Sequence, residues 1–255
     1  MLSASNETQN GADLAWMDNA PNGGLYNLYI DTVGFTPSTP TVSLTAMNPF
    51  TWTGGMPNTT YDFYVQTVCD EGATTSAIVG PVSFTTLCGT FAAPYCQGIE
   101  LFPLGGMGGN EYDCWSNTNT ADPDWTVEDG TTTSGSTGPD GPFLGSQYVY
   151  LETSSGTTGT GDTLLGPEVD VSGLTTPQLS FYYHMYGADM GSLHYQISAD
   201  NGGSWLPLDS IVGQQQLDET DPWIEETYDL TGLGSALRVR FVGIKGGGFT
   251  SDMAL

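Results

Sequence analysis

Basic residues are nearly absent from this chain of 255 residues, which has 3 Lys and Arg in total against 29 Asp and Glu. The formal net charge at pH 7 is −26, and the three cations all lie within residues 238–245. A surface of this kind repels phosphate backbones and anionic membranes, so nucleic acid is excluded as a partner. It attracts divalent cations, and the simplest interpretation is a solvated acidic surface suited to a salty exterior.

Long apolar runs are also missing. The chain has no stretch of the roughly 18 apolar residues that a membrane span needs, which excludes membrane insertion. The opening residues MLSASNETQNG have neither the basic start nor the apolar run of a signal peptide. Because a strand pattern begins at the first residues, we expect this sequence to be a fragment of a larger protein.

Catalytic motifs are equally scarce. There is no Gly-x-Ser-x-Gly, no His-Glu-x-x-His and no phosphate-binding loop. Only His184 and His194 supply imidazoles, and His184 stands between tyrosines on a predicted strand, which favours a packed, hydrogen-bonded histidine over a general base. Carboxylates are abundant, but nothing in the sequence places two of them in an apolar cleft. We therefore expect no enzymatic activity.

Four cysteines in an exported β-protein indicate two disulfides, and sequence alone allows three pairings. We favour Cys69–Cys88 and Cys96–Cys114, because each closes a short loop and would stabilise the fold by roughly 3 kcal/mol. Free buried thiols are the alternative. A zinc site is disfavoured because none of the spacings is Cys-x2-Cys.

Turn-forming residues are what the chain has in excess, with 35 Gly and 15 Pro. Together with the absence of long segments of helical period, they predict an all-β protein. The clearest pattern is the strict alternation of Leu179–Tyr186, which resumes at Leu193–Ile197. The Asn-Gly-Gly sequence in residues 199–203 then predicts a tight turn. Aromatic residues on both faces indicate either a sheet covered on both sides or one with a functional face.

The first 87 residues contain seven short strand patterns separated by turns. The predicted strands are Leu2–Ala4, Ala12–Trp16, Tyr26–Ile30, Thr41–Leu44, Phe50–Thr53, Thr60–Cys69 and Pro81–Thr85. This spacing is typical of an immunoglobulin-like sandwich. The arrangement resembles the fibronectin type III family, in which Trp16 would be the core tryptophan and Tyr61 the tyrosine of the corner. Gly55 departs from the family, which usually has a leucine there.

The later residues resemble a second family. The segments FYYHMYGADMGSLHYQIS (residues 181–198) and VRFVGIKGGGFTSDMAL (residues 239–255) are similar to the recurrent motifs of the MAM domain. Cys114-Trp115 and the Thr-Gly-Pro turn of residues 137–139 are similar to further motifs of that family. Membership implies a two-sheet jelly-roll sandwich.

We therefore predict an all-β chain of two domains. Residues 1–88 form an immunoglobulin-like (fibronectin type III) sandwich, and residues 89–255 form a MAM-like jelly-roll β-sandwich whose C-terminal end is truncated. Residues 88–94 are the expected linker, held at both ends by the two disulfides. Such a linker would limit the range of angles between the domains.

The MAM resemblance also implies a bound cation, calcium or sodium in its place, near acidic positions that lie far apart in the sequence. The matching residues here are Glu100, Asp122, Asp124 and Asp252. Calcium takes about six to eight oxygen ligands, mostly carboxylates and carbonyls. The alternative is four unrelated solvated carboxylates.

Two further features have structural and functional interpretations. Residues 198–205 have the spacing of the Asp-box of sialidases, but a single copy is best explained as a hairpin device, with Asp200 capping the turn and Trp205 packing behind it. Several aromatic side chains either cover the core or form a sugar-stacking or protein-docking face. They are Tyr182, Tyr186, Trp205 and Trp223.

Both resembled families serve mainly as adhesion and spacing modules of extracellular proteins, and the style of the sequence is similar to secreted or cell-surface multidomain proteins of bacteria. We therefore expect a non-catalytic, cation-stabilised adhesion or protein-interaction region. Its partner would be an extracellular protein or glycan, with self-association as a further option. The alternative is an accessory region that targets a secreted hydrolase or peptidase to its substrate.

Overall fold

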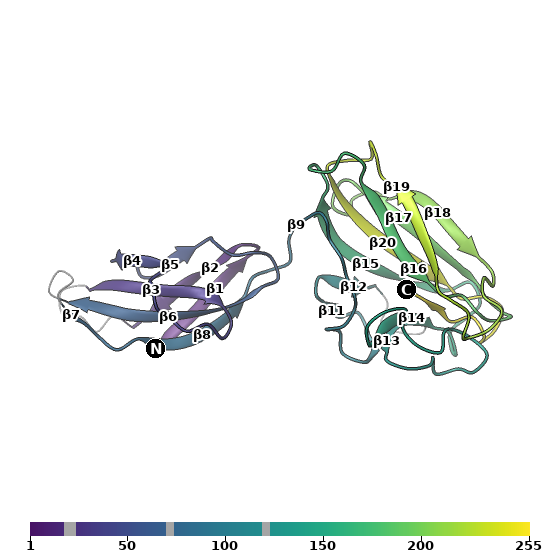
Figure 1. The fold of residues 1–255 in the computed structure, drawn as a ribbon, viewed down its shortest axis with the longest axis horizontal. Helices are drawn as coiled ribbons and strands as arrows, with labels where there is room; N and C mark the ends of the chain where they lie inside the picture. The colour runs from purple at the N-terminus through teal and green to yellow at the C-terminus, as the bar shows by residue number, and fades with distance from the viewer. Residues whose placement is uncertain (18–23, 70–73, 119–122) are drawn as a thin grey trace. The chain divides into compact units, whose positions relative to one another are not determined.

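The computed structural model describes residues 1–17, 24–69, 74–118 and 123–255. Within these ranges the chain is all-β, as the turn-rich composition predicts, with strands and no helix. Accordingly, the described residues include no helix with the length and hydrophobicity to cross a membrane. The contacts divide the chain into two units, Met1–Gly89 (unit 1) and Thr90–Leu255 (unit 2) (Figure 1).

Unit 1 contains two antiparallel sheets. In the first, β2 lies between β1 and β5. In the second, β6 pairs with β3 along one side and with β7 and β8 along the other, and β3 also pairs with β4. The strands are β1 (Leu2–Thr8), β2 (Gly11–Trp16), β3 (Leu25–Thr32), β4 (Val42–Thr45), β5 (Phe50–Trp52), β6 (Thr60–Cys69), β7 (Thr74–Thr75) and β8 (Val79–Thr85).

The core of unit 1 is built from both sheets, because alternate residues of each strand point to the same side. Leu14 of β2, Leu28 of β3 and Phe63 of β6 are fully buried in one cluster. The Trp52 ring packs edge-on against Tyr61, with ring centroids 4.8 Å apart. The seven predicted strands are therefore present, several of them longer than expected. The two-residue β7 was not predicted, since it is too short to show a period.

Unit 2 contains three sheets. The largest has the order β11-β12-β15-β20-β17-β18, with β9 added in parallel to β15. The second has the order β10-β13-β14-β21, and the third is the pair β16-β19. The bounds are β9 (Phe91–Ala92), β10 (Gly105–Gly106), β11 (Glu111–Tyr112), β12 (Trp115–Asn117), β13 (Asp124–Glu128), β14 (Tyr148–Glu152), β15 (Gly161–Asp170), β16 (Gln178–Tyr183), β17 (Ser192–Ser198), β18 (Leu206–Val212), β19 (Ile224–Asp229), β20 (Ala236–Ile244) and β21 (Met253–Ala254).

Among the described residues, one bridge joins the second and third sheets of unit 2. His184, which follows β16, exchanges both backbone hydrogen bonds with Ala254 of β21. The core cluster contains side chains from all three sheets, including Trp125 of β13, Tyr183 of β16 and Phe241 of β20. Unit 2 is thus a β-sandwich of the jelly-roll type that the sequence predicts.

The two strands predicted from residues 179–197 are present, but they belong to different sheets. β16 pairs only with β19 among the described strands, whereas β17 pairs with β18 and β20. Alternation along β16 ends where the Met185 amide donates to the side chain of Gln216, 2.8 Å away. A change of sheet between successive strands is what encloses the core from both sides.

The expected cysteine pairings are wrong. Cys69 and Cys96 are free and exposed, whereas Cys88 and Cys114 are disulfide-bonded. The prediction relied on closeness in sequence, but the fold decides which cysteines can meet. Cys69 ends β6 at the surface of unit 1. With Cys96 free, residues 88–94 are not held by a disulfide at both ends.

Candidate functional site

The four carboxylates predicted to bind a cation have separate surroundings. Asp122 lies outside the described residues. Glu100 is exposed and accepts hydrogen bonds from the Ser146 amide at 2.9 Å, from the Ser146 hydroxyl at 2.5 Å and from the Gln147 amide at 3.4 Å. These donors, the Ser146 hydroxyl first, hold the pKa of Glu100 below its ordinary value. Its carboxylate therefore stabilises the loop that contains Ser146 and Gln147.

Asp124, at the start of β13, belongs to a different network. Its carboxylate accepts from the Gly108 amide at 3.2 Å and from the side-chain amide of Asn117. The same Asn117 amide donates to Asp162 at 2.7 Å. Both Asn117 and Asp162 are buried. The Asn117 side-chain amide donates to both carboxylates, which gives these buried polar groups the hydrogen bonds that they need.

Asp252 lies in the interior beside β14. One carboxylate oxygen accepts from the amide and the hydroxyl of Thr153, at 2.9 and 2.7 Å. The other oxygen, Oδ2, is buried without a hydrogen-bond partner. Burial first, and then the nearby charge of Glu152, raises the pKa of Asp252 to about 7.

The three described carboxylates do not form a shared cation site. Each is held by different donors, and the described residues contain no group of three or more His, Cys, Asp or Glu that could hold a metal ion. A shell of about six oxygens is what calcium needs, and Glu100, Asp124 and Asp252 do not supply one. Binding of calcium or sodium stays a prediction, which calorimetric titration with calcium tests.

The two histidines have no catalytic surroundings. His184 is fully buried beside Trp223, with ring centroids 5.8 Å apart, and its ring nitrogens make no well-formed hydrogen bond. It is packed as expected, and burial lowers its pKa, although a hydrogen bond with the Asp221 backbone and the charges of Asp221 and Asp140 act in the opposite direction. His194 Nε2 lies 2.9 Å from the Ser192 hydroxyl. Residues two apart on a strand share a face, so strand geometry alone accounts for this contact.

The Asp-box-like segment forms the turn between β17 and β18. The Asp200 carboxylate accepts from the hydroxyl of Ser198 at 2.6 Å and from the amide and hydroxyl of Ser204 at 2.8 and 2.7 Å. These donors, Ser198 first, lower the pKa of Asp200 to about 2. The Trp205 ring packs under the Arg240 guanidinium, 4.2 Å from its centroid. The segment is therefore a hairpin device, as expected.

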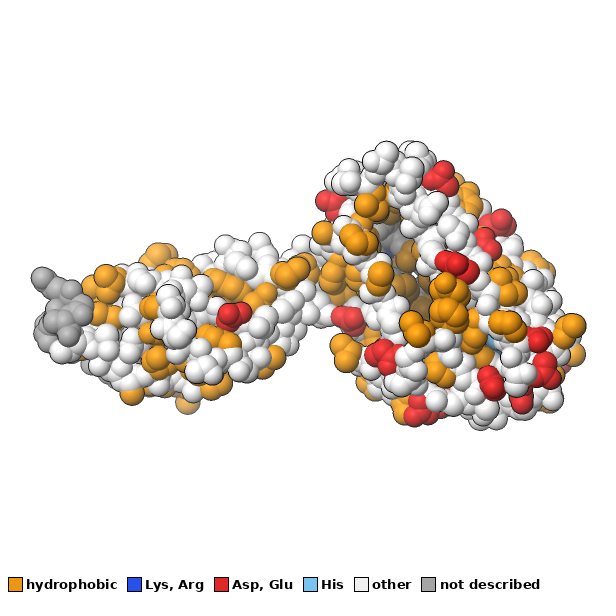
Figure 2. Space-filling model, viewed as in Figure 1, with side chains coloured by type: hydrophobic (Ala, Val, Ile, Leu, Met, Phe, Trp, Pro, Cys, Tyr) orange, Lys and Arg blue, Asp and Glu red, His pale blue; other side chains and the backbone are white. Residues whose placement is uncertain are grey.

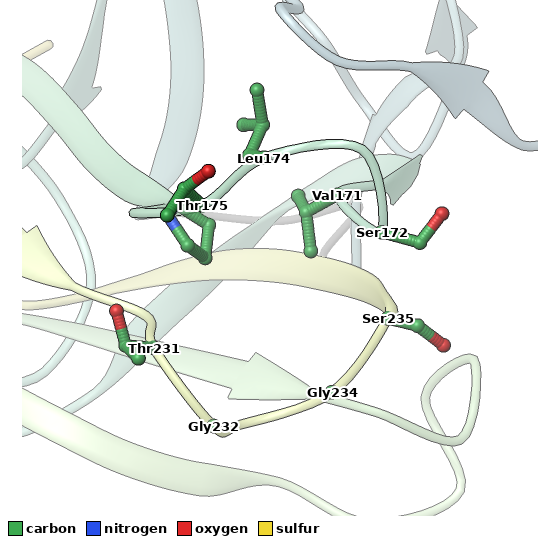
Figure 3. A pocket seen from close by; sticks show the side chains of 9 residues that line it. Val171, Ser172, Leu174, Thr175, Thr231, Gly232, Gly234 and Ser235 are labelled. Atoms are coloured by element: carbon green, nitrogen blue, oxygen red, sulfur yellow. The ribbon is translucent and has the colours of Figure 1, made fainter.

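A shallow depression on unit 2 is lined by residues of two connections, 171–177 and 231–235. Figure 3 shows Val171, Ser172, Leu174 and Thr175 on one connection and Thr231 and Ser235 on the other. Its lining contains no ionisable side chain. General acid–base chemistry needs such a group, so no side chain of this lining could act as a general acid or base.

The β16-β19 pair carries a stacked aromatic pair beside a carboxylate. Tyr182 of β16 lies directly opposite Glu225 of β19 in the antiparallel register. The ring of Phe143, from the loop before β14, stacks on Tyr182 with centroids 3.8 Å apart and planes at 14°. Phe143 nevertheless remains 47% exposed. We call Phe143, Tyr182 and Glu225 the aromatic face.

Sequence reasoning found only part of this face. Tyr182 is one of the four aromatic residues predicted to cover the core or to form a docking face, with Tyr186, Trp205 and Trp223, and all four are half-buried. Phe143 was missed because it stands in an irregular Gly-Pro-Phe loop with no period. An apolar aromatic residue inside a polar loop is the signal that would have found it.

The family comparison supplies the remaining observation. Residues 106–255, more than half of the chain, match the family model of the MAM domain, meprin/A5/mu. The chain belongs to the MAM family. The matched MAM residues begin in β10 and include every later strand of unit 2, so the aromatic face lies within the MAM domain.

Solved structures show more distant similarity. The K1 adhesin domain of Lys-gingipain from Porphyromonas gingivalis is 18% identical with a TM-score of 0.39, covering 58% of this chain and 90% of that one. The K3 adhesin domain of the same protein is 13% identical with a TM-score of 0.36, covering 60% and 94%. The secreted serine protease VesC from Vibrio cholerae is 11% identical with a TM-score of 0.31, covering 99% and 49%. These overlaps assign no function to the MAM chain.

Proposed function

We propose that this chain is a non-catalytic adhesion or protein-interaction region of a secreted or cell-surface protein. Membership of the MAM family carries the proposal, since MAM domains serve mainly as extracellular interaction modules. Fold alone does not establish a function, so the surface has to support it. The aromatic face supplies a stacked aromatic pair whose outer ring, Phe143, is exposed, and docking surfaces use such rings.

The surroundings of the ionisable residues also support this function. The Asp200 and Glu100 carboxylates accept hydrogen bonds from backbone amides of nearby turns and loops. Catalysis by acids and bases requires such groups to converge on a cleft. The depression at residues 171–177 and 231–235 has none.

Unit 1 is proposed to be a fibronectin type III-like spacer or interaction module. Its two sheets and buried Trp16 support this assignment. The Tyr61 hydroxyl accepts a hydrogen bond from the Met56 amide at 2.8 Å, and a bond between this tyrosine and the backbone shortly upstream is the feature of a tyrosine corner.

Gly55, where the family usually has leucine, lies against the rings of Trp52 and Tyr61. A Cβ there would lie 3.1 Å from both.

The function is tested with the purified 255-residue chain immobilised for interferometry. A panel of extracellular matrix and cell-surface proteins is passed over it. In a separate experiment the chain is applied in solution to a glycan array. We expect saturable binding to at least one extracellular protein. Binding to none of them would contradict the proposal.

A further inference from the structure

We propose that the aromatic face of Phe143, Tyr182 and Glu225 receives an arginine side chain from a basic segment of a partner protein. This inference rests on the proposed interaction function and names the chemistry of the partner. The face combines an exposed ring system with a carboxylate, the two groups that attract a guanidinium most strongly. The acidity of the whole chain adds a long-range attraction.

Strand geometry places the parts of this face together. Side chains alternate along β16 and β19, so Ser180 and Tyr182 share a side with Glu225 and Thr227. The Ser180 hydroxyl donates to Glu225 at 2.8 Å. Burial first, and then the charge of Glu225 and a hydrogen bond to it, raises the pKa of Tyr182. The carboxylate is therefore fixed at the edge of the stacked rings.

Phe143 contributes the exposed ring of the aromatic face. Its stacking on Tyr182 at 3.8 Å leaves 47% of its surface exposed. An aromatic ring presents a negative face to a cation, and guanidinium groups also stack on it. Within this chain the Arg240 guanidinium lies in that position over Trp205, 4.2 Å from the ring centroid. The aromatic face offers the same contact to an outside cation.

The cation has to come from a partner, because the chain's own basic groups are engaged elsewhere. Arg238 donates to the Gly166 carbonyl at 2.7 Å, and Arg240 donates to Gln196 at 2.8 Å. Lys245 is buried and donates to the Gly248 carbonyl at 3.0 Å. Figure 2 shows acidic and hydrophobic side chains on the visible face of unit 2 and no Lys or Arg. A second copy carries the same net charge of −26, so like charges oppose pairing of two such faces.

The probe for this site is a short peptide with arginine at alternate positions. Its matched control replaces each arginine by citrulline, which has a similar shape but no charge. Affinities for the full chain are measured by fluorescence anisotropy at low and at high salt. Because any polyanion attracts basic peptides, the variants decide whether binding occurs at this face.

We expect Phe143→Ala and Glu225→Gln each to raise the Kd of the arginine peptide by about 2- to 5-fold, the range for an exposed cation–π or ion-pair contact. The control variants are Leu206→Ala, which removes another exposed apolar side chain, and Asp31→Asn, which removes an exposed charge of unit 1. Both should leave the Kd unchanged.

Equal binding of the citrulline peptide would overturn the proposal. So would equal effects of the face variants and the controls, since the peptide would then bind the acidic surface in general. If Phe143→Ala abolished binding of a glycan but left binding of the arginine peptide unchanged, the face would be a sugar-binding site. That result would also contradict the proposal. If the wild-type chain binds an extracellular protein of the panel while these variants change nothing, this inference fails and the proposed function stands.

Discussion

At the scale of single residues, sequence pattern and structure part where packing depends on distant neighbours. Gly55 departs from the fibronectin type III pattern, and the rings of Trp52 and Tyr61 occupy the space that a leucine would need. The volume taken by these rings therefore explains why a glycine fits at this position. The ring of Trp52 fills the part of the core that a larger side chain at position 55 would occupy, so the total volume is kept.

Gly55→Leu tests this explanation. Overpacking against Trp52 and Tyr61 should lower the free energy of unfolding of unit 1 by about 1–3 kcal/mol. Thermal unfolding of the wild type and variant measures it, with Gly55→Ala as the smaller step. If the leucine variant unfolds at the wild-type temperature, the rings do not occupy this space and the explanation is wrong.

The cysteines give a second residue-scale prediction. Native, unreduced protein should react with iodoacetamide at Cys69 and Cys96 alone, because both are free and exposed, while Cys88 and Cys114 are protected in disulfide linkage. Peptide mapping by mass spectrometry locates the labels. Labelling at Cys88 or Cys114, or at no cysteine, would show that the bonded cysteines are assigned incorrectly.

His184 predicts a pH dependence. Burial holds its pKa below the ordinary 6.5, so below that pH the unfolded chain binds a proton that the folded chain does not. The contribution of this group to stability therefore falls as the pH drops from 6.5 toward the folded pKa.

The measurement compares the wild type with His184→Gln, which keeps a polar side chain that does not titrate. From pH 8 to pH 5 the wild type should lose stability relative to the variant. A constant difference between them over this range would mean that His184 titrates equally in both states. Should the variant fail to fold, NMR titration of the wild-type ring gives the same information.

At the scale of strands and turns, the local residue pattern is sufficient to predict where strands and turns lie. It does not predict which strands pair. Alternation predicts both β16 and β17, because each has one face in the core. It carries no information on which strand lies alongside, so the separation of β16 and β17 into different sheets could not be predicted. The Asn-Gly-Gly turn after β17 was predictable because its chemistry is local.

The β17-β18 turn depends on Asp200. Replacing it by alanine removes the acceptor of the Ser204 amide, 2.8 Å away. Hydrogen exchange at the Ser204 amide should therefore become faster in Asp200→Ala, whereas Asp209→Asn, a change at another exposed acid of β18, should leave it unaltered. Unchanged exchange in Asp200→Ala would show that the backbone alone holds the turn.

At the scale of the whole molecule, composition and motifs predicted the fold class well. Abundant glycine and proline, short alternating segments and the residue patterns near 181–198 and 239–255 led to an all-β chain with a MAM domain. The candidate site was less accessible to sequence reasoning. Glu100, Asp124 and Asp252 accept hydrogen bonds from different donors, while the aromatic face depends on Phe143, a loop residue whose position follows only from tertiary packing.

We propose that this chain binds its partner and does not transform it. The most direct measurement incubates equimolar chain with an extracellular protein captured in the binding panel and follows the intact mass of that protein with time. We expect a saturable complex and an unchanged partner mass. Cleavage or covalent modification of the partner by the purified chain would contradict the account.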